Sequence, residues 1–137
     1  MILGPALALL LCIPGVSRQA PDLAPVAELA RQALASHDAA LLLGASTRVL
    51  LQLPGAAPSA PVGRAHSKAL LDSYLDDFEE VTTEVRSVSL AGEKAGTVEL
   101  RRSYRVPGTS GVRIQSVLLA YQLIQGRWVL AELRITG

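Results

Sequence analysis

The fold is decided by residues 81–136, which read VTTEVRSVSLAGEKAGTVELRRSYRVPGTSGVRIQSVLLAYQLIQGRWVLAELRIT. Four runs in this stretch are rich in β-branched and other apolar residues, and short breaks containing glycine separate them. The sequence therefore predicts strands at Val81–Ala91, Thr97–Val106, Val112–Gln125 and Arg127–Thr136. Consecutive strands with such short connections pair as an antiparallel meander.

The pattern inside these runs predicts how each strand is buried. The apolar positions of the first run change parity near Arg86-Ser87, which predicts a β-bulge that curls the sheet. Val117–Tyr121 is apolar on both parities, so we expect this strand to be central and covered on both faces. One face of the last run is predicted to carry Val129, Ala131, Leu133 and Ile135.

Two helical patterns precede the strands. The first begins at Asp22, a good N-cap residue, and tolerates Pro25 in its opening turn. Its apolar residues recur at helical spacing on one face: Leu23, Val26, Ala27, Ala30 and Leu34. The second helix is predicted from Ala65 to Phe78, again with one apolar face.

Three short features lie between these helices. Asp38 is predicted to cap a short helical turn, Ala39–Leu43, and Thr47–Leu53 is predicted to be a short strand. Residues 54–63 contain three prolines and are predicted to form a mobile loop near the rim of the sheet.

This order of elements predicts an α+β fold, with N-terminal helices packed on a strongly curved antiparallel sheet. Such a sheet has one face to bury, and two helices cover only part of it. We expect a ligand or partner to lie on the uncovered part of the concave face.

Composition limits the functions that the chain can have. At 137 residues there is room for one domain with a core, and a hydrophobic content of 50% excludes a disordered chain. A formal net charge of +1 provides no electrostatic attraction to nucleic acid, so nucleic-acid binding is not expected. We find no catalytic or cofactor-binding motif and predict no cofactor.

Residues 1–17 are predicted to be a signal peptide. The stretch from residue 2 to 17 is uncharged, is interrupted by Pro14 and Gly15, and is shorter than the roughly 20 residues of a membrane span. Gly15 and Ser17 are small enough for the −3 and −1 positions of a cleavage site. We expect one exported domain at residues 18–137, with an uncleaved anchor or a packed N-terminal segment as the alternatives.

Cys12 is the only cysteine and lies in this segment. We expect an ordinary apolar position, because Leu11 is bulkier than the residue that precedes a lipidated cysteine. After cleavage the domain would have no thiol, which excludes disulfides and cysteine-based metal sites.

Several short segments, combined with this order of elements, carry a resemblance to a known superfamily. They are residues 35–41 (ASHDAAL), 51–55 (LQLPG), 67–69 (SKA), Phe78, 126–130 (GRWVL) and 132–135 (ELRI). Residues 22–137 resemble the nuclear transport factor 2-like superfamily, whose fold is a cone of helices and curved sheet. They look most similar to an uncharacterised family of small exported bacterial domains in it.

The resemblance implies a strongly bent sheet with a pocket between sheet and helices. It also implies a periplasmic or extracellular location in a bacterium, and a homodimer through the sheet, an assembly common in the superfamily. Its members include isomerases, dehydratases, hydrolases and assembly modules, so the fold does not select a function.

The histidines are weak candidates for catalysis. Pocket enzymes of the superfamily commonly use an Asp with a His or Tyr inside the cone as acid–base partners, and this chain offers only two histidines for that role. His37 precedes the capping Asp38 and His66 opens the second helix, so both are predicted to lie at the surface. Neither occupies an inward-facing strand position.

An acidic cluster follows the second helix: Asp72, Asp76, Asp77, Glu79 and Glu80. Their oxygens could converge on Ca²⁺, but no loop alternates carboxylates around a glycine as calcium-binding loops do. We expect a solvated helix face and no metal site.

Arginines gather on the meander: Arg101, Arg102, Arg105, Arg113 and Arg127. With Glu99 and Glu132 between them, we expect cross-strand ion pairs on an exposed face, the alternative being an anion-binding or partner surface. Arg102 has the parity of Leu100 and Tyr104. It is expected either to point into the pocket and bind a carboxylate or phosphate, or to lie at a bulge or the rim.

Buried Tyr and Trp side chains usually keep one hydrogen bond, and here structural packing is the ordinary expectation. Tyr104 and Tyr121 lie on neighbouring predicted strands and are the better candidates to line a pocket. The candidate pocket residues are Tyr104, Arg102, Tyr121 and Tyr74, and no catalytic residue is predicted.

The sequence predicts a binding or assembly domain. Its ligand would be a small apolar or amphipathic molecule in the cone pocket, or a protein partner on the sheet face. The alternative is a pocket enzyme that transfers protons with Tyr104, Arg102 or a carboxylate, as isomerases and dehydratases do. A structural remnant with a pocket filled by Leu and Val is a third hypothesis. An enzyme requires a titratable group in the cavity, whereas a binding domain can be apolar throughout.

Overall fold

The computed structural model describes residues 22–57 and 60–137. The helices are α2 (Ala24–Ala35), α3 (Ala39–Leu43) and α4 (Arg64–Leu75), and the strands are β1 (Arg48–Gln52), β2 (Val62–Gly63), β3 (Glu79–Leu90), β4 (Ala95–Arg105), β5 (Val112–Ile124) and β6 (Arg127–Thr136). The predicted signal peptide, with Cys12, lies outside the described residues, as do residues 58 and 59 of the predicted loop.

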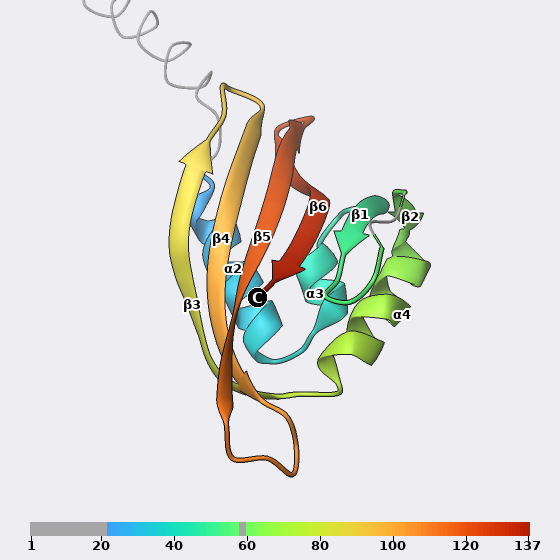
Figure 1. Ribbon diagram of the computed structural model, residues 1–137. Helices are drawn as coiled ribbons and strands as arrows, with labels where there is room; N and C mark the ends of the chain where they lie inside the picture. Colours follow the sequence, from blue (N-terminus) through green and yellow to red (C-terminus); the bar gives the residue numbers. More distant parts are fainter. Residues whose placement is uncertain (1–21, 58–59) are drawn as a thin grey trace, which may run out of the picture.

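The strands form one sheet in the order β2-β1-β6-β5-β4-β3. Strands β3 to β6 are the predicted antiparallel meander, and β1 runs parallel to β6 with Leu51 opposite Leu133. The sheet is curved, and α2 and α3 lie behind it in Figure 1, while α4 lies beside β1 and β2. The predicted α+β fold with a curved antiparallel sheet is confirmed.

Alternation along β4 and β5 positions the core. The inner face of these strands buries apolar side chains at every second position, among them Val98, Leu100, Val117, Leu119 and Tyr121. These pack against the buried face of α2, which includes Ala27, Ala30 and Leu34. The outer face of the same strands carries the intervening residues and is covered by no helix that the structure describes (Figure 1).

The predicted bulge is confirmed, because the pairing of β3 with β4 changes register between Val85 and Ser87. A second register change lies between Glu80 and Thr82, at the start of β3. Two bulges in one edge strand strengthen its twist and its bend.

Two predictions of burial were wrong. β5 is central, as expected, but only its inner face is covered, and Leu118 on the outer face is 36% exposed. In β6 the inner face holds Leu130, Leu133 and Ile135 instead of a strict alternation. The pairing skips Ala131, since Ala120 faces Glu132 while Tyr121 faces Leu130. This bulge reverses the parity of the first part of β6.

The predicted boundaries were also wrong in two places. The second helix ends at Leu75 instead of Phe78, because the chain turns there and the Phe78 ring packs edge-on against Tyr74 and Tyr104. The end of the predicted loop contains β2, which pairs with β1. In the part of the chain that the structure describes, no helix is both long and apolar enough to cross a membrane.

Candidate functional site

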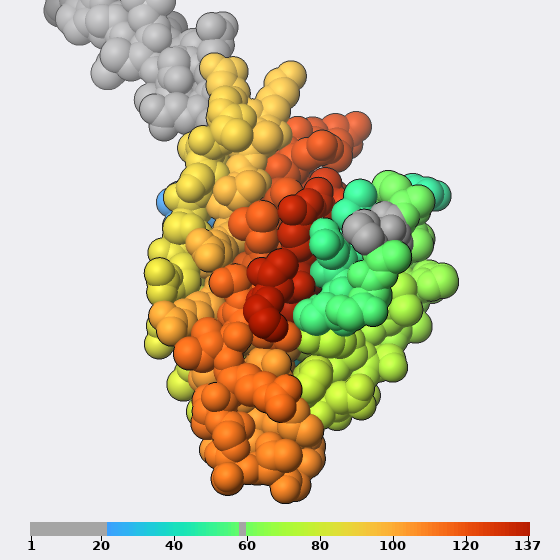
Figure 2. Space-filling view, viewed as in Figure 1, coloured from blue at the N-terminus to red at the C-terminus, as the bar shows by residue number. Residues whose placement is uncertain are grey.

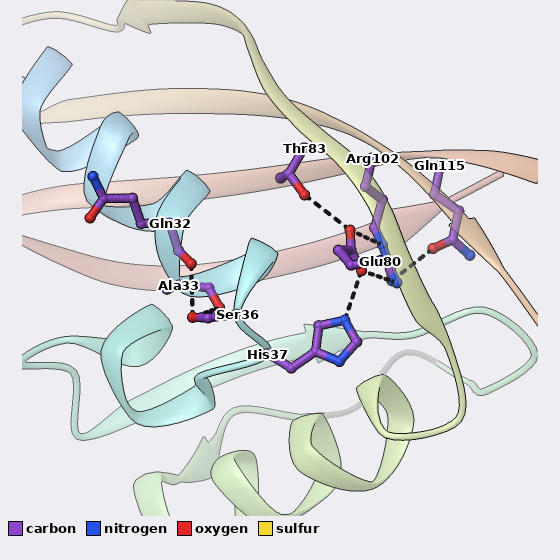
Figure 3. A network of polar contacts seen from close by, with 8 residues as sticks. All are labelled: Gln32, Ala33, Ser36, His37, Glu80, Thr83, Arg102 and Gln115. Atoms are coloured by element: carbon purple, nitrogen blue, oxygen red, sulfur yellow. Dashed lines mark hydrogen bonds and ion pairs between the residues drawn. The ribbon is translucent and has the colours of Figure 1, made fainter.

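A buried polar cluster lies where β3, β4 and β5 meet the end of α4 and the joint between α2 and α3. At its centre Arg102 is completely buried, on the inner face of β4. Its Nε and Nη2 donate to Glu80 Oε2 and Oε1 at 3.0 and 2.6 Å, and Nη1 donates to Gln115 Oε1 at 3.3 Å. Figure 3 shows the guanidinium between these two side chains.

Glu80 connects Arg102 to the helices. Its Oε1 lies 2.7 Å from His37 Nε2, and its Oε2 accepts a hydrogen bond from Thr83 Oγ1 at 3.1 Å (Figure 3). Because an ionised carboxylate only accepts hydrogen bonds, His37 Nε2 is the donor of this pair. The Glu80 side chain is only 9% exposed.

Aromatic rings enclose the cluster on its other side. The Arg102 guanidinium lies 4.7 Å from the centre of the Tyr104 ring and 5.7 Å from that of Phe78, within the range of cation–π attraction. Gln115 Nε2 donates to Tyr74 Oη at 2.9 Å. Burial is the main cause that raises the pKa of Tyr74.

The cluster is satisfied by the protein itself. Among the described residues, no fully buried side-chain nitrogen or oxygen lacks a hydrogen-bond partner. Arg102 was expected either to bind the anionic group of a ligand or to lie at a rim. The structure places it inside the cone, and the carboxylate that it binds belongs to Glu80.

The histidine and acidic predictions were partly wrong. His37 is half-buried rather than at the surface, and it adopts a positive φ of 55° at the joint between the helices. Glu80 is turned into the fold, whereas Asp72 pairs with Lys68 at 2.7 Å on the solvated face of α4. Within the described ranges, no group of His, Cys, Asp or Glu side chains is arranged to hold a metal ion.

The four candidate pocket residues divide between two places. Tyr104, Arg102 and Tyr74 belong to the buried polar cluster, but Tyr121 does not contact it. Tyr121 lies farther along β5, where the sheet faces α2 and α3. There it lines a cavity of about 200 Å³, which we call the apolar pocket. Its lining residues are Val26, Leu29, Ala30, Leu41, Leu42, Leu43, Gly44, Ala45, Tyr121, Trp128 and Leu130.

The apolar pocket contains a single titratable side chain among these lining residues, Tyr121. Burial raises the pKa of Tyr121 far above that of an exposed tyrosine, so its phenol is neutral at physiological pH. Leu29 and Leu41 are 47% and 37% exposed and lie at the mouth of the pocket. The pocket therefore suits a neutral, mostly apolar molecule.

The outer sheet face is a second surface without a described covering element. Figure 2 shows β3 to β6 open to the viewer on this side. Its exposed apolar residues are Val112, Ile114, Leu118 and Ile124, with exposures from 36% to 52%. Arg101 lies opposite Glu84 on β3, beside a shallow hollow of about 230 Å³ that Ile114 also lines.

Sequence reasoning missed Glu80, His37 and Gln115 as members of the buried polar cluster. Gln115 had a usable signal, because it shares the parity of Val117 and Leu119 and so must face inward. Glu80 and His37 had none. The register change at the start of β3 and the positive φ of His37 orient them, and neither is visible in the sequence.

Comparisons with known proteins agree with this architecture. No protein-family model matches the sequence, and no curated protein matches it significantly. A ketosteroid isomerase-like protein from Erwinia carotovora atroseptica superposes with a TM-score of 0.67 at 15% identity, covering 82% of this chain and 91% of that one. A DUF4783 family protein from Bacteroides ovatus superposes with a TM-score of 0.65 at 15% identity, covering 78% and 90%.

A second DUF4783 family protein, from Bacteroides uniformis, superposes with a TM-score of 0.63 at 14% identity, covering 80% of this chain and 94% of that one. Identities this low establish the fold and leave the activity open. The resemblance predicted from the sequence is confirmed at the level of the fold: the chain has the cone-shaped α+β fold seen in nuclear transport factor 2-like proteins.

Proposed function

We propose that the chain is an exported binding domain that holds a small apolar or amphipathic molecule in the apolar pocket. The observation that carries the proposal is the pocket's lining, which is aliphatic and aromatic apart from one phenol. The cavity of about 200 Å³ is smaller than the 300–1,000 Å³ typical of drug-sized ligands, so the ligand is a small one.

The same lining favours binding over proton-transfer catalysis. A general acid or base works best with a pKa near the operating pH. Burial moves the pKa of Tyr121 away from neutrality, and no other titratable side chain lines the pocket among the residues described. The carboxylate and guanidinium of the buried polar cluster are occupied by one another.

A titration with a small hydrocarbon tests this proposal. The chain has one tryptophan, Trp128, and it lines the pocket, so its fluorescence and backbone ¹H–¹⁵N NMR shifts report occupancy directly. Methylenecyclohexane should shift the signals of the lining residues. Leu29→Lys, which introduces a charge at the mouth, should weaken binding about tenfold or more.

The matched control is Leu70→Lys on α4, since Leu70 is 37% exposed and does not line the pocket. It should bind the hydrocarbon as the unaltered chain does. Equal losses in the two variants, or no shifts at all, would contradict the pocket as a ligand site.

A second function is favoured by the outer sheet face, which we propose binds another copy of this chain. Apolar residues exposed along one strand, Val112, Ile114 and Leu118, are typical of an interaction surface. Nearby charges of both signs, Arg101 and Glu84, let two copies meet about a twofold axis without net repulsion.

Sedimentation velocity tests the dimer. The unaltered chain should show a concentration-dependent dimer, and Leu118→Arg should make it monomeric. Leu90→Arg is the control. Leu90 is more exposed, at 63%, but it lies opposite Gly96, on the inner face of the edge strand β3. A monomer at all concentrations, or equal effects of the two variants, would count against the dimer.

A further inference from the structure

We infer that the apolar pocket selects neutral molecules that carry one hydrogen-bonding oxygen, such as a ketone, ether or alcohol, and that the hydroxyl of Tyr121 binds this oxygen. The inference rests on the proposed function and names the class of ligand and the residue that recognises it.

The first observation is that Tyr121 is an almost completely buried polar side chain without a partner. Its exposure is 5%, yet its hydroxyl forms no hydrogen bond with any residue that the structure describes. By contrast Tyr74, which is less buried, has its hydroxyl bonded to Gln115. Because this hydroxyl has no partner among the described residues, its hydrogen-bonding capacity is available to a ligand oxygen.

The second observation is that this hydroxyl is accessible and that its residue lines the cavity. Every fully buried side-chain oxygen or nitrogen in the described ranges has a partner, so the Tyr121 oxygen retains some accessible surface. Tyr121 lines the apolar pocket together with Trp128 and Leu130. The accessible oxygen of a residue that lines the pocket is available to a ligand bound there.

The third observation excludes charged ligands. The lining residues include no acid and no base, so a carboxylate or ammonium group would lose its hydration without gaining a counter-ion. Arg102, the buried cation on the inner face, is already paired with Glu80. The phenol of Tyr121 can donate a hydrogen bond to an uncharged oxygen or accept one from a hydroxyl, which suits a ketone, ether or alcohol.

Two isosteric probes separate this inference from the proposed function. Cyclohexanone and methylenecyclohexane differ only in whether an oxygen or a CH₂ group is attached to the ring, and NMR titration gives a dissociation constant for each. Tyr121→Phe keeps the ring and removes the hydroxyl. We expect this substitution to weaken the affinity for cyclohexanone about fivefold to thirtyfold. The affinity for methylenecyclohexane should change by no more than about twofold.

Cyclohexanecarboxylate is the third probe and should not bind. If Tyr121→Phe changes the affinities of the ketone and the hydrocarbon equally, or if the carboxylate binds best, the inference is overturned while the pocket stays a ligand site. If none of the three probes shifts the lining residues, the proposed function fails with it. Tyr74→Phe, whose ring lies in the buried polar cluster, should alter neither affinity.

Discussion

Glu80 is the single residue on which the buried polar cluster depends, because its carboxylate contacts Arg102, His37 and Thr83. Arg102 has no exposed surface, so it cannot turn to water if this partner is removed. A buried charge left alone is among the costliest defects in a protein. We therefore assign the cluster a structural role inside the cone.

We expect Glu80→Ala to lower the free energy of unfolding by about 3–5 kcal/mol, measured by urea denaturation. Glu84→Ala is the matched control, because Glu84 lies on the same strand but is exposed on the outer face, and it should change stability by about 0.5 kcal/mol or less. A similar loss in both variants would show that the Glu80–Arg102 pair adds nothing.

The double variant Glu80→Leu with Arg102→Met tests the same pair from the other side. Replacing both members of a buried ion pair with apolar residues is often neutral or stabilising. The double variant should therefore be more stable than Glu80→Ala. If it is less stable, the hydrogen bonds that His37 and Gln115 form with the pair matter more than the charge.

Because the phenol of Tyr121 is buried, we expect the folded protein to lose stability in alkali. Burial raises its pKa in the folded protein, whereas in the unfolded chain the phenol ionises near pH 10. Above about pH 10 the unfolded state releases the proton and the folded state retains it, so the free energy of unfolding falls as pH rises. Each such tyrosine contributes a slope of about 1.4 kcal/mol per pH unit.

Urea denaturation at pH 9, 10 and 11 measures this slope. Tyr121→Phe should flatten it in part, because burial also raises the pKa of Tyr74. Tyr74→Phe should remove a further part. Identical slopes for the unaltered chain and Tyr121→Phe between pH 10 and 11 would contradict a buried, neutral phenol.

Among the elements, the contact between α2 and the meander depends on a glycine. Gly96 lies on the inner face of β4, and a Cβ atom there would meet Leu23 Cδ2 at 2.7 Å and the Ser89 carbonyl oxygen at 3.2 Å. Leu23 is 2% exposed and has little room to move. The absence of a side chain at Gly96 lets the start of α2 approach the sheet.

We expect Gly96→Ala to destabilise the fold by about 1–3 kcal/mol, since overpacking forces side chains out of their preferred rotamers. Gly111→Ala is the control: its Cβ would meet nothing within 4 Å and its φ is not positive. That substitution should be neutral or slightly stabilising. Thermal unfolding followed by circular dichroism compares them, and equal midpoints would refute the close approach.

The elements also show where sequence reasoning succeeds and where it fails. The strands of the meander were predicted within a few residues, because the alternation along β4 and β5 is long and regular. The inner face of β6 was wrong, since one extra residue, Ala131, reverses the parity. The predicted end of α4 was wrong because Phe78 packs against Tyr74 nearby in the chain and against Tyr104 on β4. These contacts outweigh the helical spacing of the apolar residues.

At the scale of the whole molecule, one strand separates the two proposed binding surfaces. Tyr121 faces the apolar pocket and Leu118 lies on the opposite parity, on the outer sheet face. We expect the two functions to be independent. Tyr121→Phe should leave the dissociation constant of the dimer unchanged, and Leu118→Arg should leave the affinity for cyclohexanone unchanged. Sedimentation and NMR titration of both variants check this, and a cross-effect larger than about threefold would show coupling.

The proposal of export makes a further prediction for the whole chain. When the protein is expressed in a bacterial host, we expect to recover it outside the cytoplasm. Its mass should be that of a chain that begins at Arg18, after cleavage behind Ser17. Leu9→Arg, which places a charge in the apolar segment, should retain it in the cytoplasm. An intact Met1 on exported protein would indicate an uncleaved anchor instead.

The sequence by itself determined the class of fold, the meander and the presence of an apolar face on α2, because these follow from local periodicity. It also showed that Arg102 shares the parity of buried residues. Only the tertiary structure decided that Glu80 joins His37 to Arg102, and that Tyr121 lies apart from them in the apolar pocket. Those contacts join α2, β3, β4 and β5, and bulges and a positive φ set their geometry, so no periodicity along the chain could encode them.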